Sequence, residues 1–211
     1  MRNKLLLTYN KLYSHFGPQH WWPGETPFEV AVGAVLTQNT NWGNVEKAID
    51  NLKREGKLNA SAIHKITTES LAALIKPAGY FNVKAKRLKH FVSFLMKDYG
   101  GSMSRMKDAK LPSIREDLLR VNGIGPETAD SIILYALEKP VFVVDAYTKR
   151  VLSRHNIKDH DASYASFQEL FDSNLKRDFR LFNEYHALFV RVAKEHCRTK
   201  PLCEGCPLEG M

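Results

Sequence analysis

Residues that could perform chemistry lie mainly in the C-terminal third of the chain. An acid, Asp145, ends the apolar run 141–144, and three cysteines, Cys197, Cys203 and Cys206, follow close to the C-terminus. A carboxylate in this position can stabilise a developing positive charge or activate water, although an acid that opens a helix most often only caps it. An odd number of cysteines at this spacing indicates a metal site in a reducing compartment rather than disulfides. Zinc is one candidate metal, and a tail without metal is the alternative.

A glycine-rich turn precedes this acid. A helical pattern ends at Val121, and the turn Gly123–Ile124–Gly125 leads directly into Pro126, a residue favoured at the first position of a helix. The two glycines allow a tight turn and leave backbone N–H groups bare at the start of the second helix, where a phosphate could bind. Ile124 would pack between the two helices. The alternative is an ordinary corner between helices without a ligand.

The hairpin, the helix after it and the apolar run that ends at Asp145 together resemble the helix–hairpin–helix DNA glycosylases of the endonuclease III superfamily. The resemblance extends over most of the chain, from about Thr26 to Cys206. It implies that Asp145 is the catalytic carboxylate, which stabilises the oxocarbenium character that glycosidic cleavage builds on the sugar. It also implies that the partner is duplex DNA, from which a damaged base is flipped before excision.

One position separates two kinds of enzyme in this superfamily. Members that also cut the DNA backbone carry a lysine two residues after the second hairpin glycine, where it forms a Schiff base with the sugar. Glu127 occupies this position here, and a carboxylate cannot form an imine. The resemblance therefore predicts a monofunctional glycosylase without AP-lyase activity. Glu127 also suits the first turn of a helix on electrostatic grounds alone.

The segment 28–42 resembles the early helix and following loop of the family, which plug the gap left by the flipped base and line its pocket. Gln38 and Asn39 are the candidate plugs. The adenine-removing branch needs an acid on the helix before the Gln-Asn-Thr motif, and residues 30–36 carry none. We also expect the protein to lack the extra C-terminal domain of that branch.

Three tryptophans are candidate walls of a base pocket: Trp21, Trp22 and Trp42. The order Trp-Trp-Pro, then Leu-Thr-Gln-Asn-Thr, then an aromatic residue resembles the 3-methyladenine DNA glycosylase III branch, which excises alkylated purines. Each ring would attract a cationic base by ~0.5–2 kcal/mol through cation–π interaction. Core packing is the alternative for Trp21. A uracil or thymine mismatch glycosylase remains the alternative activity, and its pocket would need hydrogen-bonding partners for the base edge.

The cysteine-rich tail also resembles that of many endonuclease III relatives, which hold a 4Fe–4S cluster with four cysteines. The resemblance implies that Cys197, Cys203 and Cys206 are cluster ligands. It places a fourth cysteine around position 212, whereas the sequence ends at Met211. His196 is a possible substitute ligand.

Helices must position all these groups. Apolar residues recur at helical spacing in the segments 44–54, 71–75, 85–96, 147–153, 164–171 and 182–193. Ser113–Glu116 has the pattern of a capping box that opens a helix, and only the run 141–144 has a strand-like composition. We predict an all-α, two-lobed endonuclease III-like fold with a helix–hairpin–helix motif. A six-helix barrel domain covers residues 26–139, and residues 1–25 and 140–211 form a second helical domain with the Cys-rich loop.

Composition agrees with a nucleic-acid partner. The chain of 211 residues has 31 Lys and Arg against 23 Asp and Glu, a net charge of +8, which suits a polyanion but is also found in ordinary basic proteins. No apolar run approaches the ~20 residues of a membrane span, and the N-terminus lacks a signal-peptide pattern. We therefore expect a monomer in the cytoplasm, nucleoid-associated in a prokaryote, without a membrane partner. The remaining alternative, a non-catalytic helix–hairpin–helix DNA-binding protein, gives no reason for an acid such as Asp145 beside phosphates.

Overall fold

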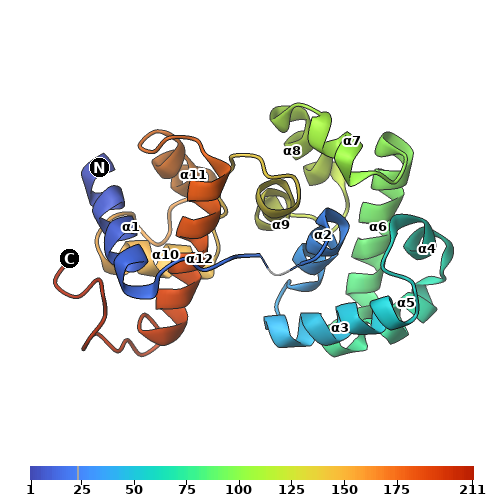
Figure 1. Ribbon diagram of the computed structural model, residues 1–211, viewed down its shortest axis with the longest axis horizontal. Helices are drawn as coiled ribbons and strands as arrows, with labels where there is room; N and C mark the ends of the chain where they lie inside the picture. The colour runs from blue at the N-terminus through green and yellow to red at the C-terminus, as the bar shows by residue number, and fades with distance from the viewer. Residues whose placement is uncertain (23) are drawn as a thin grey trace. The chain divides into compact units, whose positions relative to one another are not determined.

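The structure, a computed structural model, describes residues 1–22 and 24–211, and within these residues no strand occurs (Figure 1). The all-α prediction is therefore confirmed. The chain divides into two compact units: unit 1 comprises Met1–Trp22 and Pro140–Met211, and unit 2 comprises Pro23–Lys139. Among the described residues, none of the helices combines the length and apolar character needed to cross a membrane.

Unit 2 is organised around α2 (Pro27–Leu36), in which every residue from Glu29 to Leu36 is buried. This follows from its sequence, because a helix that is apolar on all sides belongs in a core. Thr26 caps it by accepting a hydrogen bond from the backbone N–H of Glu29. The other helical segments of the unit are α3 (Trp42–Arg54), α4 (Ala60–Lys65), α5 (Thr68–Leu74), the 3₁₀ turn η1 (Lys76–Ala78), α6 (Phe81–Tyr99), α7 (Met103–Asp108), α8 (Leu111–Arg120), α9 (Pro126–Ser131) and the π-helical turn η2 (Ile132–Ala136). Of these, α3, α6, α9 and η2 contact α2.

Unit 1 contains α1 (Arg2–Phe16), α10 (Ala146–Arg154), α11 (Tyr164–Asp172) and α12 (Phe179–Glu195). Helix α12 contacts both α1 and α10, and its buried face is rich in aromatic residues. The rings of Phe142 and Phe171 stack 3.5 Å apart, and Tyr185 meets both edge-on. Tyr185 also donates a hydrogen bond to the carbonyl of Leu5 at 2.8 Å, which ties α12 to α1.

One local expectation differs from the structure. The capping box predicted at Ser113–Glu116 is wrong, because α8 already begins at Leu111 with Pro112 in its first turn. Proline is well tolerated in the first turn of a helix, and the helix starts three residues earlier than a cap at Ser113 would place it. The strand-like run 141–144 is fully buried but forms no strand. Side chains rather than a neighbouring strand provide hydrogen-bond partners for this segment, as described below.

Candidate active site

Asp145 lies where the buried segment 141–144 meets α10. Its backbone is extended, and its Oδ1 atom accepts a hydrogen bond of 2.7 Å from the backbone N–H of Thr148. This is the geometry of a helix N-cap, so the capping role expected for this acid is confirmed. The cap fixes the rotamer of the side chain and uses only one of its two oxygens.

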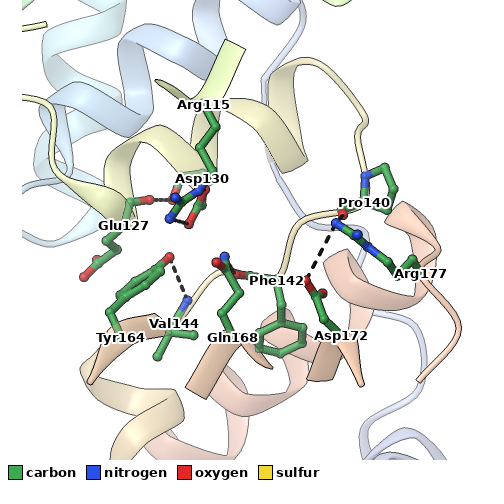
Figure 2. A network of polar contacts seen from close by, with 11 residues as sticks. Arg115, Glu127, Asp130, Pro140, Phe142, Val144, Tyr164, Gln168, Asp172 and Arg177 are labelled. Atoms are coloured by element: carbon green, nitrogen blue, oxygen red, sulfur yellow. Dashed lines mark hydrogen bonds and ion pairs between the residues drawn. The ribbon is translucent and has the colours of Figure 1, made fainter. Parts of the chain in front are cut away.

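The segment that leads into Asp145 is held by side chains of α11 (Figure 2). Gln168 donates from Nε2 to the carbonyl of Phe142 at 2.9 Å, and the backbone N–H of Val144 donates to the hydroxyl of Tyr164 at 3.3 Å. These bonds satisfy backbone groups that would otherwise be buried without partners. They also fix the path of the chain into α10, and with it the position of the Asp145 carboxylate.

A buried histidine on α12 faces the same carboxylate. The Nε2 atom of His186 lies 3.5 Å from Oδ2 of Asp145, and the two side chains are 5% and 14% exposed. Burial by itself would raise the pKa of Asp145, but the nearby His186 and the hydrogen bonds from Thr148 outweigh it, so the pKa lies below its ordinary value. Asp145 is therefore a carboxylate at neutral pH.

The two glycines of the hairpin differ in what they contribute. Gly123 has a φ of +90°, and a Cβ there would overlap Cγ of Arg87 and lie 2.8 Å from its Cδ, so Arg87 packs directly against the turn. Gly125 has a φ of −91°, and a Cβ there would meet no atom within 4 Å. Ile124 between them is buried, as expected of a residue that packs between helices. The backbone conformation and the packing of Arg87 therefore require glycine at position 123. At Gly125 neither requires it, and the surface of the turn there is open.

An ion pair with a buried carboxylate joins the two helices that flank the turn (Figure 2). Arg115 on α8 donates from Nε and Nη2 to the two carboxylate oxygens of Asp130 on α9, at 2.8 and 3.1 Å, and the Asp130 side chain is fully buried. A bidentate pair of this kind fixes orientation as well as distance. Glu127 is exposed in the first turn of α9, where its charge suits the helix terminus.

The two candidate plug residues have different environments within unit 2. The Nε2 atom of Gln38 donates to the carbonyl of Gly123 at 3.1 Å and to Oγ1 of Thr128 at 2.9 Å, and Arg87 donates to its Oε1. Gln38 therefore ties the loop after α2 to the hairpin. Asn39 is exposed and has a φ of +54°, which turns it away from the helical path at the tip of the same loop.

The three tryptophans are half-buried. Trp42 is the first residue of α3, and its Nε1 donates to Oε1 of Glu46, one turn further along the helix, at 2.7 Å. A carboxylate therefore lies at the edge of this ring. The rings of Trp21 and Trp22 meet edge-on with their centroids 5.6 Å apart.

The cysteine-rich tail surrounds a cavity of about 310 Å³ in unit 1. Cys197, Cys203 and Cys206 all line it, together with His196 and Arg154. Arg154 donates from Nη1 to Sγ of Cys197 at 3.3 Å. In the described part of the chain, however, no three cysteine, histidine or acidic side chains converge closely enough to hold a metal ion. The cysteines thus share a cavity, but they do not form a coordination sphere, and the donor set does not fit a bound metal as it stands.

The predicted site residues are distributed over both units. Unit 1 holds Asp145, Trp21, Trp22 and the three cysteines, and unit 2 holds Gln38, Asn39, Trp42, the hairpin 123–125 and Glu127. Sequence reasoning did not find His186, Arg87 or the Arg115–Asp130 pair. A signal existed for His186, because it occupies a position on α12 whose neighbours along the buried face are apolar. No comparable signal marks Arg87, which is one of several basic residues on α6.

Comparisons with known proteins agree on one family. Residues 32–177 match the family model of the HhH-GPD superfamily base excision DNA repair proteins. The "Putative DNA repair glycosylase MJ1434" of Methanocaldococcus jannaschii is 48% identical over 202 residues, which cover 95% of this chain and 92% of that protein.

Solved structures lead to the same group. The crystal structure of H. pylori 3-methyladenine DNA glycosylase bound to 1,N6-ethenoadenine is 31% identical, with a TM-score of 0.78 over 92% of this chain and 97% of that one. A non-covalent endonuclease III–DNA complex has a TM-score of 0.83 at 20% identity, covering 99% of this chain and 93% of that one. The second likeness concerns the fold alone.

Proposed function

Because the chain belongs to the HhH-GPD superfamily of base excision DNA repair proteins, we propose that it is a monofunctional DNA glycosylase. It binds duplex DNA, flips a damaged base out of the stack and hydrolyses the bond between that base and its sugar. The preferred substrate is an alkylated purine of the 3-methyladenine type. We place this activity on a monomer at the chromosomal DNA, in the cytoplasm or nucleoid.

The environment of Asp145 is the observation that carries this proposal. Breaking the C1′–N bond sends its electron pair to the departing base and leaves positive charge on the sugar. A carboxylate that is already charged and already oriented stabilises this charge with little reorganisation. The cap at Oδ1, the neighbouring His186 and the low pKa of Asp145 support this role.

The choice of an alkylated purine rests on Trp42 and on the H. pylori enzyme. That protein is a 3-methyladenine DNA glycosylase, and it is 31% identical to this chain over nearly its full length. Trp42 offers a ring with the Glu46 carboxylate at its edge. Both features favour a base that carries positive charge, because the ring face and the carboxylate each attract a cation. Trp21 and Trp22 are proposed as further walls of the pocket.

Contacts with DNA are assigned to two segments of unit 2. The open surface at Gly125 allows a phosphate to approach the backbone of the hairpin 123–125 closely. We assign the gap-filling role to Asn39, which is exposed at the tip of its loop, and not to Gln38, whose amide is engaged with the hairpin. The net charge of +8 supports binding to a polyanion.

Two further parts of the proposal concern Glu127 and the tail. Glu127 stands where a lyase would need an amine, so excision should leave an intact strand with an abasic site. A 4Fe–4S cluster at Cys197, Cys203 and Cys206 rests on the resemblance of the cysteine spacing. Three thiolates are one fewer than the usual four ligands, and the excision steps proposed here do not involve the tail.

A glycosylase assay on five defined duplexes tests the proposal. The duplexes carry 3-methyladenine, 7-methylguanine, hypoxanthine, uracil or a G·T mismatch, and each reaction is analysed with and without alkali. We expect release of alkylated purines and strand cleavage only after alkali. Release of uracil or mispaired thymine in preference to alkylated purines would establish the mismatch activity instead. Strand cleavage without alkali, with an adduct trapped by borohydride, would show that the protein is a lyase.

A further inference from the structure

Both oxygens of the Asp145 carboxylate have a defined neighbour. Oδ1 accepts the capping hydrogen bond from the backbone of Thr148, and Oδ2 lies 3.5 Å from Nε2 of His186. His186 is on α12, beside the buried aromatic residues Tyr185 and Phe189. Burying an imidazole among aromatic rings costs free energy unless the ring has a polar partner. The carboxylate supplies such a partner from a different helix.

We propose that His186 is a positioning residue for Asp145: it holds Oδ2 in place and keeps the carboxylate negatively charged. Asp145 then acts on the sugar as a fixed anion and not as a base toward water. This inference rests on the glycosylase activity proposed above. It adds His186 to the site and assigns charge stabilisation, and not proton abstraction from water, to Asp145.

The chemistry of excision explains why these roles differ. When the C1′–N bond of an alkylated purine breaks, the electron pair leaves with the base, which departs as a neutral molecule. The sugar cation is then captured by water at C1′, and the added water loses a proton to the solvent. A carboxylate assists the first step most when it stays ionised, whereas it assists the loss of the proton most when it is basic. An acid with a lowered pKa is a weak base, so the pair with His186 favours the first role.

Several other charged groups on the helices that pack against α12 have partners elsewhere. On α10, Lys149 donates to the carbonyl of Ala162, Arg150 to that of Cys197 and Arg154 to that of Arg198. On α1, Lys4 donates to the carbonyl of His155, and the Tyr9 ring packs edge-on against Tyr185. Among the described residues, His186 is the ionisable side chain whose interactions lower the pKa of Asp145.

Two substitutions of similar size separate this role from simple packing. His186→Leu removes the polar partner, and His186→Gln keeps an N–H donor at similar reach without the ionisable ring. Single-turnover excision is measured from about pH 3 to 8, a range that reaches the lowered pKa of Asp145, with folding checked by circular dichroism at each pH. For His186→Leu we expect the midpoint of the acid limb to rise by about one pH unit or more. At pH values below the wild-type midpoint, the rate of the variant should then be about tenfold or more lower than that of the wild type. His186→Gln should lie between this variant and the wild type in both respects.

A structural role alone would give a different pattern. If His186→Leu lowers the rate equally at all pH values and leaves the midpoint unchanged, or if both variants match the wild type, the proposal is overturned. The carboxyl carbon of Asp145 provides a second readout that needs no activity. Its titration, followed by NMR, should shift to higher pH in His186→Leu, and an unshifted titration overturns the proposal.

The two readouts also distinguish this inference from the proposed function. If the wild type excises no base from any duplex, or if Asp145→Asn retains full excision, the glycosylase assignment or the role of Asp145 fails. The carboxyl titration still decides in that case whether His186 keeps Asp145 charged.

Discussion

Replacing the first hairpin glycine should reveal how strongly Arg87 supports the turn. At Gly123 two effects act together, because φ is +90° and an added Cβ would overlap the Arg87 side chain. A left-handed backbone costs an ordinary residue ~1–2 kcal/mol. Overpacking against Arg87 adds ~1–3 kcal/mol. Gly123→Ala should therefore lower the free energy of unfolding by roughly 2–5 kcal/mol.

A double-mutant cycle separates the two contributions. In an Arg87→Ala background the overlap is absent, so the cost of Gly123→Ala should fall to the backbone contribution of ~1–2 kcal/mol. Gly125→Ala is the matched control. Its φ is −91° and the space around it is open. The free energy of unfolding should therefore change by no more than about 0.5 kcal/mol. Binding to damaged and undamaged duplex should nevertheless weaken alike, because the added methyl group lies where a phosphate would approach.

Urea unfolding followed by circular dichroism measures the stabilities, and fluorescence anisotropy of labelled duplexes measures the affinities. An equal cost of Gly123→Ala with and without the Arg87 side chain would refute the overlap argument. If Gly125→Ala weakens binding only to damaged duplex, the hairpin contacts the base and not the phosphate. If it leaves all binding unchanged, the open surface at Gly125 is not a DNA contact.

Further substitutions test other parts of the account. Asp145→Asn keeps the shape of the side chain but removes its charge, so excision should fall at least about a hundredfold while DNA binding is retained; turnover close to wild type would remove Asp145 from the mechanism. Trp42→Ala should sharply reduce excision of 3-methyladenine with little effect on affinity for undamaged duplex, and an equal loss of affinity for undamaged duplex would instead make Trp42 a general DNA contact. Buried Lys84, whose pKa burial lowers to about 8, binds a proton less readily in the folded than in the unfolded chain, so the free energy of unfolding should rise between pH 8 and 10. Urea titrations of Lys84→Met should show a flatter pH dependence, and an unchanged slope would assign it to other groups. Metal analysis and the absorption spectrum of protein purified without chelator test the tail: iron with iron–sulfur absorption would support a cluster at the three cysteines, and the finding of neither iron nor zinc would leave them without a metal role.

Short-range patterns were the most reliable guide to the fold. The spacing of apolar residues predicted helices that the structure contains, and the apolar character of 30–36 explains why α2 lies in the core of its unit. The start of α8 was missed because Pro112 and the pattern Ser113–Glu116 are both good helix-opening signals, and only packing selects between them. The run 141–144 has the composition of a strand, but its partners are side chains of α11, which periodicity does not detect.

The helical fold, the family resemblance and the choice of Asp145 as the candidate acid follow from the sequence, because each depends on local patterns and short motifs along the chain. Only the tertiary structure decided what surrounds these residues. His186 reaches Asp145 from another helix, and Gln38 binds the carbonyl of Gly123 across 85 positions of sequence. Such contacts depend on how the helices pack, and other residues of the same types elsewhere in the chain could have made them. The charge state of Asp145 and the engagement of Gln38 therefore follow from packing and could not be read from the chain.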